Sequence, residues 1–327
     1  MRLFGRRTLI GNPPAQPQDR LDWRASAPFF GFHLALPLLF VTGLAWEWVL
    51  IALIAYTLRM LATSAGFHRY FSHRAFKTNR VLQFLLAFVA QSSWPRGVLW
   101  WATHDRLHHK QAETSGDVHS PVRRGFWWGH AGWLLSKRFD KTDYDAIKEF
   151  SRFPELVWLN EHPLVPLITS LVIALFLGGL PAVMFACVVP TVLMWHATLS
   201  LSSLSHLFGR RRYLTPDASR NSFLISLVTF GEGWHNNHHH SQGSARLGFF
   251  WWELDLTWCL LELLSYVGVV RDVRQPRAEV RDAHLGYDAE QLALLKAQSG
   301  FGKFDAARVP TPPGERLAVG PAGLTSR

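Results

Sequence analysis

Cysteine is nearly absent from this chain, and acidic residues are fewer than basic ones. Only Cys187 and Cys259 occur among 327 residues, which excludes a disulfide framework and a metal site built from four thiolates. Any bound metal must therefore be held by nitrogen or oxygen. The chain has 24 acidic residues against 34 Lys and Arg, a net charge of +10 that fits either nucleic acid or an anionic membrane surface.

Long stretches lack charge almost entirely, and they favour a lipid bilayer over nucleic acid as the partner. Residues 28–46 carry no formal charge, residues 48–65 carry one, and residues 163–205 carry none. A bilayer span needs about 20 apolar residues, so the third stretch is long enough for two spans, and a glycine pair at 178–179 interrupts it. The sequence predicts four transmembrane helices in two hairpins. They cover residues 28–46, 48–65, 163–178 and 181–205.

Neither predicted hairpin turn contains Lys or Arg. Basic residues are instead frequent before residue 28, between residues 66 and 162, and after residue 206. By the positive-inside rule, these three regions and both termini are expected in the cytoplasm. Arg59 lies near the cytoplasmic end of its span, where its long side chain is expected to extend to the interface.

The remaining segments are shorter or more polar. Residues 81–89 are too few to span a bilayer and residues 248–270 contain three acidic residues, so both are expected at the interface or in the core. Residues 1–27 are interpreted as a basic cytoplasmic arm and residues 276–327 as a loosely ordered tail. The predicted fold class is an all-α integral membrane protein, in which residues 28–275 form one domain with a cytoplasmic helical cap.

Nine of the sixteen histidines gather in three clusters on the expected cytoplasmic side. The clusters are His68 and His73; His104, His108 and His109; and His235, His238, His239 and His240. Each cluster spreads over neighbouring faces of a helix, and an even number of spans separates the last two, so all three can converge. Imidazole binds iron, zinc, copper and nickel, so the ligand type does not name the metal. Eight or more imidazoles are too many for one ion and favour a two-metal site for oxygen chemistry.

The stretches around these clusters carry a family resemblance. They read GFHRYFSHR at 66–74, DVHSP at 117–121, RGFWW at 124–128, GWLL at 132–135 and GEGWHNNHH at 231–239. These motifs resemble the membrane fatty acid desaturases, most closely the bacterial acyl-CoA delta-9 branch related to stearoyl-CoA desaturase. The resemblance covers roughly residues 28–275. It implies two iron ions held by the clustered histidines, molecular oxygen as the oxidant, an external two-electron supply, and His206 as an extra ligand.

Two positions depart from the pattern of this family. Acyl-CoA members carry a histidine three residues before the His-His pair of the second cluster, where this chain has Asp105, preceded by His104. Imidazole and carboxylate both suit iron. We prefer His104 as the ligand, because it lies about 40° from His108 on a helix, and keep Asp105 as a second ligand candidate or a hydrogen-bonding neighbour. Ser202 stands where the family often has an asparagine that holds a metal-bound water.

The expected reaction is oxygen-dependent desaturation of a fatty acyl chain, and the resemblance implies an acyl-CoA substrate and a double bond at carbon 9. An unactivated methylene has no useful acidity, so hydrogen removal needs a metal-based oxidant. The chain would lie in a narrow apolar tunnel with aromatic walls, for which Trp101 is a candidate. Lys137 and Arg138 match a basic pair that faces the coenzyme A phosphates in the family. No fused haem or flavin segment is recognisable, so a separate ferredoxin, rubredoxin or cytochrome b5 type protein, with a reductase, is expected to supply electrons.

Alternative functions make different demands on the sequence. An acyl-lipid desaturase would share every feature above except the carrier of the acyl chain. A hydroxylase of the same superfamily would differ only in its product. A non-catalytic metal-transport or metal-sensing membrane protein should place ionisable ligands inside its spans, whereas these clusters lie outside them. The expected location is a bacterial inner membrane, with the active site on the cytoplasmic side.

Overall fold

The computed structural model describes residues 17–300, and these residues are almost entirely helical. Within this part of the chain the one sheet consists of two short strands, β1 (Lys77–Thr78) and β2 (Val270–Arg271). They pair antiparallel and join the segment after the first histidine cluster to the segment after helix α14 (Leu256–Tyr266). The predicted helical fold class is therefore confirmed for the described residues.

Three stretches are long and apolar enough to cross a bilayer. They contain 20, 27 and 42 residues with mean hydropathies of 1.5, 1.6 and 2.5, and about 20 residues suffice for one span. The first is Trp23–Thr42, with α1 (Trp23–Ala35) and α2 (Leu39–Thr42). The second is Trp46–Ser72, with α3 (Trp46–Ala62) and a π-helical segment (Thr63–Ser72). The third is Val165–His206, with α10 (Val165–Ala182), a π-helical segment (Val183–Val188) and α11 (Val189–Ser203).

The third stretch reverses direction at its glycine pair. Gly178 and Gly179 have non-helical backbone angles, and Gly179 has φ +62°. The Cys187 thiol lies 3.5 Å from the Ser170 carbonyl, although 17 residues of straight helix would separate them by about 25 Å. The stretch Val165–His206 therefore forms two antiparallel arms, and the break lies where the sequence predicted it.

The first turn lies a few residues earlier than predicted. Gly43, with φ +70°, ends α2, and Glu47 belongs to the first turn of α3. The first hairpin is also longer than predicted. Its helical stretches begin at Trp23 instead of residue 28 and end at Ser72 instead of residue 65. The Asp22 carboxylate caps α1 by accepting from the backbone nitrogens of Arg24 and Ala25, at 3.1 and 3.2 Å. This cap starts α1 at Trp23, before the predicted start of the span at residue 28.

Arg59 does not extend to the interface as predicted. Arg59 is only 7% exposed, and its Nη1 atom donates to the carbonyl oxygen of Ala186 at 2.6 Å. Ala186 lies in the π-helical segment Val183–Val188, where the regular α-helical pairing is interrupted, and the guanidinium binds its carbonyl there. Ser92, Thr191 and Cys187 are its other hydrogen-bond partners, and all of them are neutral.

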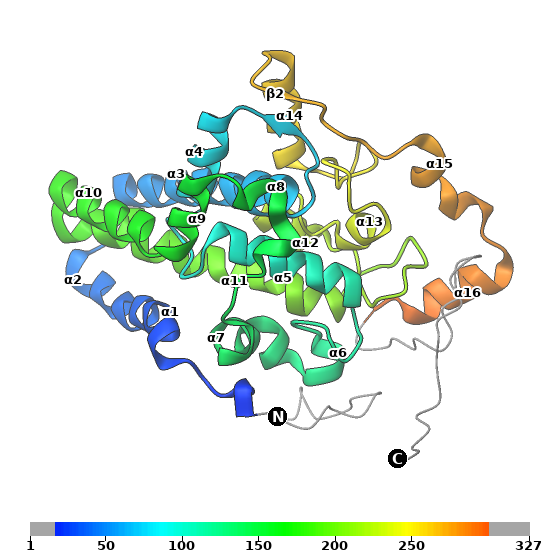
Figure 1. The fold of residues 1–327 in the computed structure, drawn as a ribbon, viewed down its shortest axis with the longest axis horizontal. Coiled ribbons are helices and arrows are strands. Elements are labelled where there is room, and N and C mark those ends of the chain that lie inside the picture. Colours follow the sequence, from blue (N-terminus) through cyan, green and yellow to red (C-terminus); the bar gives the residue numbers. More distant parts are fainter. Residues whose placement is uncertain (1–16, 301–327) are drawn as a thin grey trace.

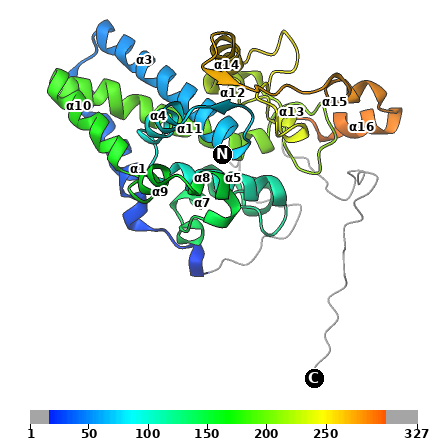
Figure 2. The same ribbon diagram turned by 45° about the horizontal axis from the view of Figure 1, so that its top comes forward.

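The shorter helices pack together on the side of the molecule away from the two turns. Figure 1 shows α3 and α10 reaching the left edge, while α13, α15 and α16 lie on the right, and Figure 2 shows the same separation. These helices are α4 (Arg80–Gln91), α5 (Val98–Gln111), α6 (Pro121–Arg124), α7 (Trp133–Leu135), α8 (Lys148–Ser151), α9 (Pro154–Glu161), α12 (Phe223–Thr229), α13 (His235–His240), α15 (Ala278–Arg281) and α16 (Ala289–Gln298).

The C-terminal tail is more ordered than the sequence suggested. Residues 276–300 contain α15 and α16, so a loosely ordered tail does not begin at residue 276. Buried Gln298 holds α16 in place, because its side-chain oxygen accepts from Arg211 at 2.9 Å and its carbonyl accepts from Arg220 at 3.0 Å. The rest of the predicted tail, residues 301–327, and most of the N-terminal arm, residues 1–16, lie outside the described residues.

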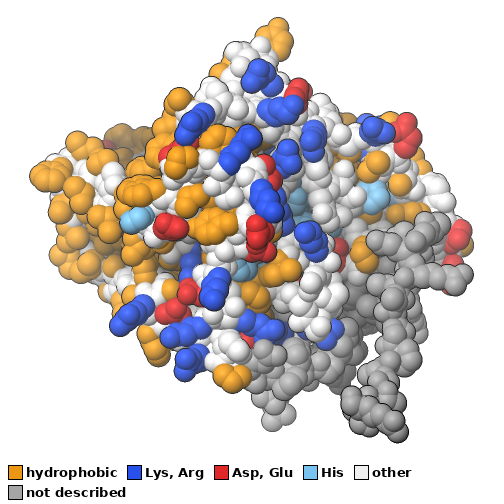
Figure 3. All heavy atoms as spheres, viewed as in Figure 1, with side chains coloured by type: hydrophobic (Ala, Val, Ile, Leu, Met, Phe, Trp, Pro, Cys, Tyr) orange, Lys and Arg blue, Asp and Glu red, His pale blue; other side chains and the backbone are white. Residues whose placement is uncertain are grey.

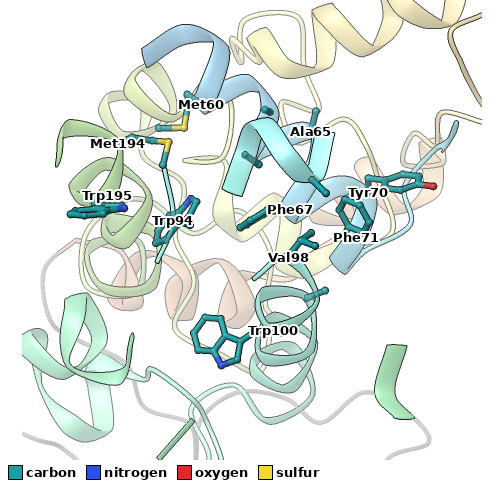
Figure 4. Packing of buried hydrophobic residues seen from close by; sticks show 14 of the residues in the cluster. Met60, Ala65, Phe67, Tyr70, Phe71, Trp94, Val98, Trp100, Met194 and Trp195 are labelled. Atoms are coloured by element: carbon teal, nitrogen blue, oxygen red, sulfur yellow. The ribbon is translucent and has the colours of Figure 1, made fainter. Parts of the chain in front are cut away.

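Apolar side chains cover one end of the molecule and charged side chains cover the other. In Figure 3 the hydrophobic surface gathers over the end formed by α3 and α10, whereas Lys, Arg, Asp and Glu spread over the remainder of that face. Behind this surface, Met60, Met194, Trp94 and Trp195 pack between α3, α11 and the loop before α5 (Figure 4). This packing holds the apolar helices against the histidine-bearing segments.

Candidate metal centre

The histidine clusters converge into two groups of four imidazoles. The ligand atoms of each group lie within 4.8 Å of one another. The first group is His68, His73, His109 and His238. The second group is His108, His206, His235 and His239. Every predicted histidine ligand except His104 belongs to one of them, so the convergence predicted from the even number of spans is present in the structure.

Nitrogen–nitrogen distances within the groups match those between ligands of one ion. The Nε2 atom of His238 lies 3.0 Å from Nε2 of both His68 and His109, and Nε2 of His206 lies 3.0 Å from Nε2 of His235. Two donors about 2.1 Å from one ion and at right angles to each other lie about 3 Å apart. Each group therefore has the spacing of a coordination shell.

Several buried nitrogens in these groups have no hydrogen-bond partner among the described residues. They include Nε2 of His108 and of His239, which belong to the second group. An unpaired buried polar atom costs about 1–3 kcal/mol, so a cluster of them needs another kind of partner. A metal ion accepts several imidazole lone pairs at once, and imidazole suits iron. The donor sets thus fit two metal ions.

Carboxylates support four of the eight imidazoles from behind. Three of them accept a hydrogen bond from the Nδ1 atom of a histidine, and Glu232 lies in close contact with the Nδ1 atom of His68, so the Nε2 atom of each ring is free to face its group. The pairs are His108 with Asp117 at 2.8 Å, His206 with Glu113 at 2.9 Å, His239 with Asp217 at 2.8 Å, and His68 with Glu232 at 2.5 Å. Such partners fix the tautomer and the ring orientation of a metal ligand, so the imidazoles are held in place by the protein.

Burial and neighbouring charge shift the pKa values of these acids. Burial alone would raise the pKa of Asp217, but its contact with His239 outweighs burial and holds the pKa well below the usual range. The same competition, with His68 and Arg69 as the partners, lowers the pKa of Glu232 to about 2. Burial and the nearby Asp117 carboxylate raise the pKa of Glu113 to about 7. Asp217 and Glu232 are therefore held as carboxylates.

Sequence reasoning assigned no role to these four acids. Asp117 and Glu232 stand inside motifs that carry the family resemblance, and Glu113 follows the second cluster by four residues. Asp217 lies in a loop with no recognisable signal. Glu113 also has a left-handed backbone, with φ +61°, which is unusual outside glycine and typical of functional sites. Only the folded structure shows which imidazole each acid meets.

The third motif places its histidines through its glycines and asparagines. Gly231 has φ +120°, and a Cβ there would lie 2.2 Å from the Asp255 carboxylate, so only glycine fits this turn. The Asn221 side chain caps α13 by accepting from the backbone nitrogens of Asn236 and Asn237, at 2.9 and 3.1 Å. The Asn237 side chain in turn donates to the Leu247 carbonyl at 2.9 Å. These contacts fix the helix, and His235, His238 and His239 belong to the two groups.

The structure does not bring His104 into either group. Its Nδ1 lies 2.7 Å from the Trp100 carbonyl, and its ring packs on Trp100, away from the other histidines. Burial lowers its pKa to about 4. On a helix, residue 105 projects between residues 108 and 109, whereas residue 104 projects about 40° beyond residue 108, outside that arc. Our preference for His104 considered its angle from His108 alone, and Asp105 lies at the first group instead.

A cavity adjoins both groups, with about 690 Å³ of space free of atoms in the cavity and its mouth. His68, Asp105, His108 and His235 line one part of it. Its other walls are Met60, Thr63, Ser64, His119, Trp101, Trp133, Thr198, Leu201, Ser202 and Glu232. Ligand pockets are mostly apolar with a few convergent polar groups. The walls of this cavity have that composition, which suits an acyl chain. Trp101 thus lines the cavity, as a substrate contact must.

Three other predicted site residues, Ser202, Lys137 and Arg138, make contacts that differ from their predicted roles. Ser202 lines the cavity, but its hydroxyl donates to the Gly129 carbonyl at 2.8 Å. Arg138 pairs with Asp19 at 3.2 Å, and Lys137 is exposed beside it. Neither basic residue lines the cavity that adjoins the histidines.

Comparisons with known proteins agree with this geometry. The family model described as fatty acid desaturase matches residues 15–267. The chain is 33% identical over 268 residues to the sn-2 palmitoyl-lipid 9-desaturase of Nostoc sp. (strain 36), covering 80% of this chain and 92% of that protein. It is 34% identical over 265 residues to the sn-1 stearoyl-lipid 9-desaturase of Synechocystis sp., covering 80% and 83%. It is also 34% identical over 256 residues to the acyl-CoA C20 delta5-desaturase of Anemone leveillei, covering 75% and 80%.

Proposed function

Because this chain belongs to the fatty acid desaturase family, we propose that it inserts a double bond at carbon 9 of an acyl chain in a membrane glycerolipid, at a centre of two iron ions. The chain is an integral, multi-pass membrane oxidoreductase. The observation that carries the proposal is the pair of four-imidazole groups beside one apolar cavity. A transporter site would need its ligands near the bilayer midplane, but these stand at the ends of the apolar stretches.

The proposed chemistry divides between metal and protein. Bound iron supplies the oxidising power that hydrogen removal from an unactivated methylene requires. Two hydrogens of the acyl chain, with two further electrons and two protons, reduce molecular oxygen to two waters. The protein supplies position: the carboxylates fix the imidazoles, and the cavity walls hold one carbon pair near the groups and exclude water.

The carrier of the acyl chain is proposed to be a glycerolipid, with coenzyme A as the alternative. Both lipid 9-desaturases named above match 80% of this chain, whereas the acyl-CoA relative matches 75% and carries a delta5 activity in its name. The coenzyme A alternative depends on Lys137 and Arg138, and Arg138 is already paired with Asp19. A lipid carrier also suits a protein whose apolar helices are exposed along the membrane-facing end.

Electrons are proposed to come from a separate protein of ferredoxin, rubredoxin or cytochrome b5 type, with its reductase. The matched family region, residues 15–267, occupies most of the chain and contains the histidine motifs. The docking surface of the external donor is proposed to be the charged part of the molecule, away from the apolar end. Such a donor delivers the two electrons that each turnover consumes.

The proposed activity is tested by expressing the chain in a bacterial host with and without oxygen. Mass spectrometry should locate a new double bond at carbon 9 in aerobic cells only, appearing first in intact glycerolipids. Product appearing first in the acyl-CoA pool would replace the lipid carrier by coenzyme A. A hydroxylated chain without a double bond would identify a hydroxylase, and no new product would refute the proposal.

The proposed topology has four spans, with both termini and the metal centre in the cytoplasm. Gly179 and residues 43–45 form the two turns between apolar helices. A reporter inserted at either turn should be active only outside the cytoplasm, because neither turn carries the Lys and Arg that retain a loop inside. Reporters at the termini should be active inside. A cytoplasmic signal from residue 179 would contradict the paired hairpins.

Met60 is expected to limit the length of the acyl chain. It is 1% exposed, lines the cavity and lies beside Met194 (Figure 4). Met60→Ala should shift the products towards longer chains, and Met60→Trp should reduce conversion of the longest substrate most. Met184→Ala is the control, because Met184 is just as deeply buried but does not line the cavity. Chain-length profiles that match the control would remove Met60 from this role.

A further inference from the structure

The first group contains a carboxylate as well as four imidazoles. Oδ2 of Asp105 lies 3.0 Å from Nε2 of His73 and 3.9 Å from Nε2 of His109, and its side chain is 15% exposed. Asp105 also lines the cavity. We propose that the Asp105 carboxylate binds the metal ion of the first group directly, as its fifth protein ligand. The inference rests on the proposed metal centre, and it gives the two ions different ligand sets.

The first argument is geometric. The separation of 3.0 Å between Asp105 Oδ2 and His73 Nε2 equals the nitrogen–nitrogen separations already described within this group. It is also the separation expected for two neighbouring ligands of one ion, about 3 Å. Both atoms are buried, and neither has a partner in hydrogen-bond geometry among the described residues. Their spacing and burial are those of two neighbouring ligands of one ion.

The second argument concerns charge. Three acidic side chains, of Glu113, Asp117 and Asp217, stand behind imidazoles of the second group. The first group has only Glu232 behind His68. The charge of Glu232 is shared, because Arg69 donates to its carboxylate at 3.0 Å. A divalent ion in a buried site needs nearby negative charge, and Asp105 supplies it to the group that otherwise has least.

The third argument comes from helix α5. Three side chains project from one side of this helix. Asp105 and His109 lie at the first group, and His108 belongs to the second. Because Asp105 and His109 are four residues apart, they stand one above the other and can reach the same ion. The His104 side chain does not project from this side of the helix, and its ring packs on Trp100. It is therefore the natural control for any change made at Asp105.

The test compares iron content and Mössbauer spectra of protein reconstituted anaerobically with ⁵⁷Fe²⁺. Wild-type protein should hold about two irons per chain, in two different environments of equal population. Asp105→Ala should hold about one iron and lose one quadrupole doublet. Asp105→His should hold both irons, with the same doublet shifted because nitrogen replaces oxygen. His104→Gln should match the wild type in both measurements.

The outcomes separate this inference from the proposed function. Two irons and two unchanged doublets in Asp105→Ala would overturn the carboxylate ligand but leave the metal centre intact. If the alanine variant fails to fold, an unshifted spectrum in Asp105→His would overturn the ligand instead. Loss of iron in His104→Gln but not in the Asp105 variants would assign the role to His104. Wild-type protein without iron would refute the metal centre and this inference together.

Discussion

Replacing His239 by alanine is expected to remove the iron of the second group and to abolish desaturation. His239 offers Nε2 to that group while Asp217 holds its Nδ1, so no neighbouring side chain can take its place. Iron content should fall from about two to about one per chain, and turnover should fall by on the order of 100-fold or more. Both are measured on anaerobically reconstituted protein, by metal analysis and by product formation.

The next residue along the chain provides a matched control. His240 stacks on Tyr213, with ring centroids 3.9 Å apart, and its Nε2 lies 2.9 Å from the Val280 carbonyl. It therefore faces away from both groups, and His240→Ala should keep two irons. Equal losses in the two variants would mean that α13 itself had been disrupted, and full activity in His239→Ala would remove this residue from the ligand set.

Replacing Asp217 by asparagine is expected to weaken iron binding without removing any ligand. The amide keeps the size of the side chain but loses the charge that fixes His239, and such changes typically reduce metal affinity by about 10–100-fold. The expected result is normal iron content in excess ferrous iron and rapid loss of about one iron on dilution with a chelator. Iron retention after timed chelation measures this directly.

Asp140 is the corresponding control for Asp217. Its carboxylate pairs with Arg96, and its side chain is 53% exposed. This contact involves none of the clustered histidines. Asp140→Asn should release iron at the wild-type rate. If Asp217→Asn also released iron at that rate, the carboxylate behind His239 would have no influence on the metal, and the same role for Glu113 and Asp117 would become doubtful.

Local sequence patterns were sufficient for much of this fold. Charge-free stretches as long as a bilayer span marked the apolar helices, and the glycine pair at 178–179 marked the reversal. These features depend only on residues that are close together in the chain, so they can be recognised from the sequence alone. The histidine clusters were visible for the same reason, since ligands to a shared ion repeat at helical spacing.

Other features depend on partners far apart in the chain. Asp217 reaches His239 through the fold of a loop, and Glu113 meets His206 across 93 residues. No spacing in the sequence announces either contact. Similarly, Arg59 is close enough to the end of its helix to extend outward, and only the fold shows that it meets the carbonyl of Ala186. The tail after residue 276 was misjudged because contacts with Arg211 and Arg220 order a segment of low hydrophobicity.

Arg59 also bears on how the protein is made. Its partner carbonyl on Ala186 lies 127 residues later in the chain, so at a synthesis rate of about 5–20 residues per second it emerges roughly 6–25 s afterwards. During that interval the guanidinium lacks its partner on Ala186, and an Arg inside a bilayer costs at most about 2.5–3.5 kcal/mol, the value for a helix centre. The leucines and isoleucines of α3 must therefore offset a temporary penalty as the ribosome proceeds.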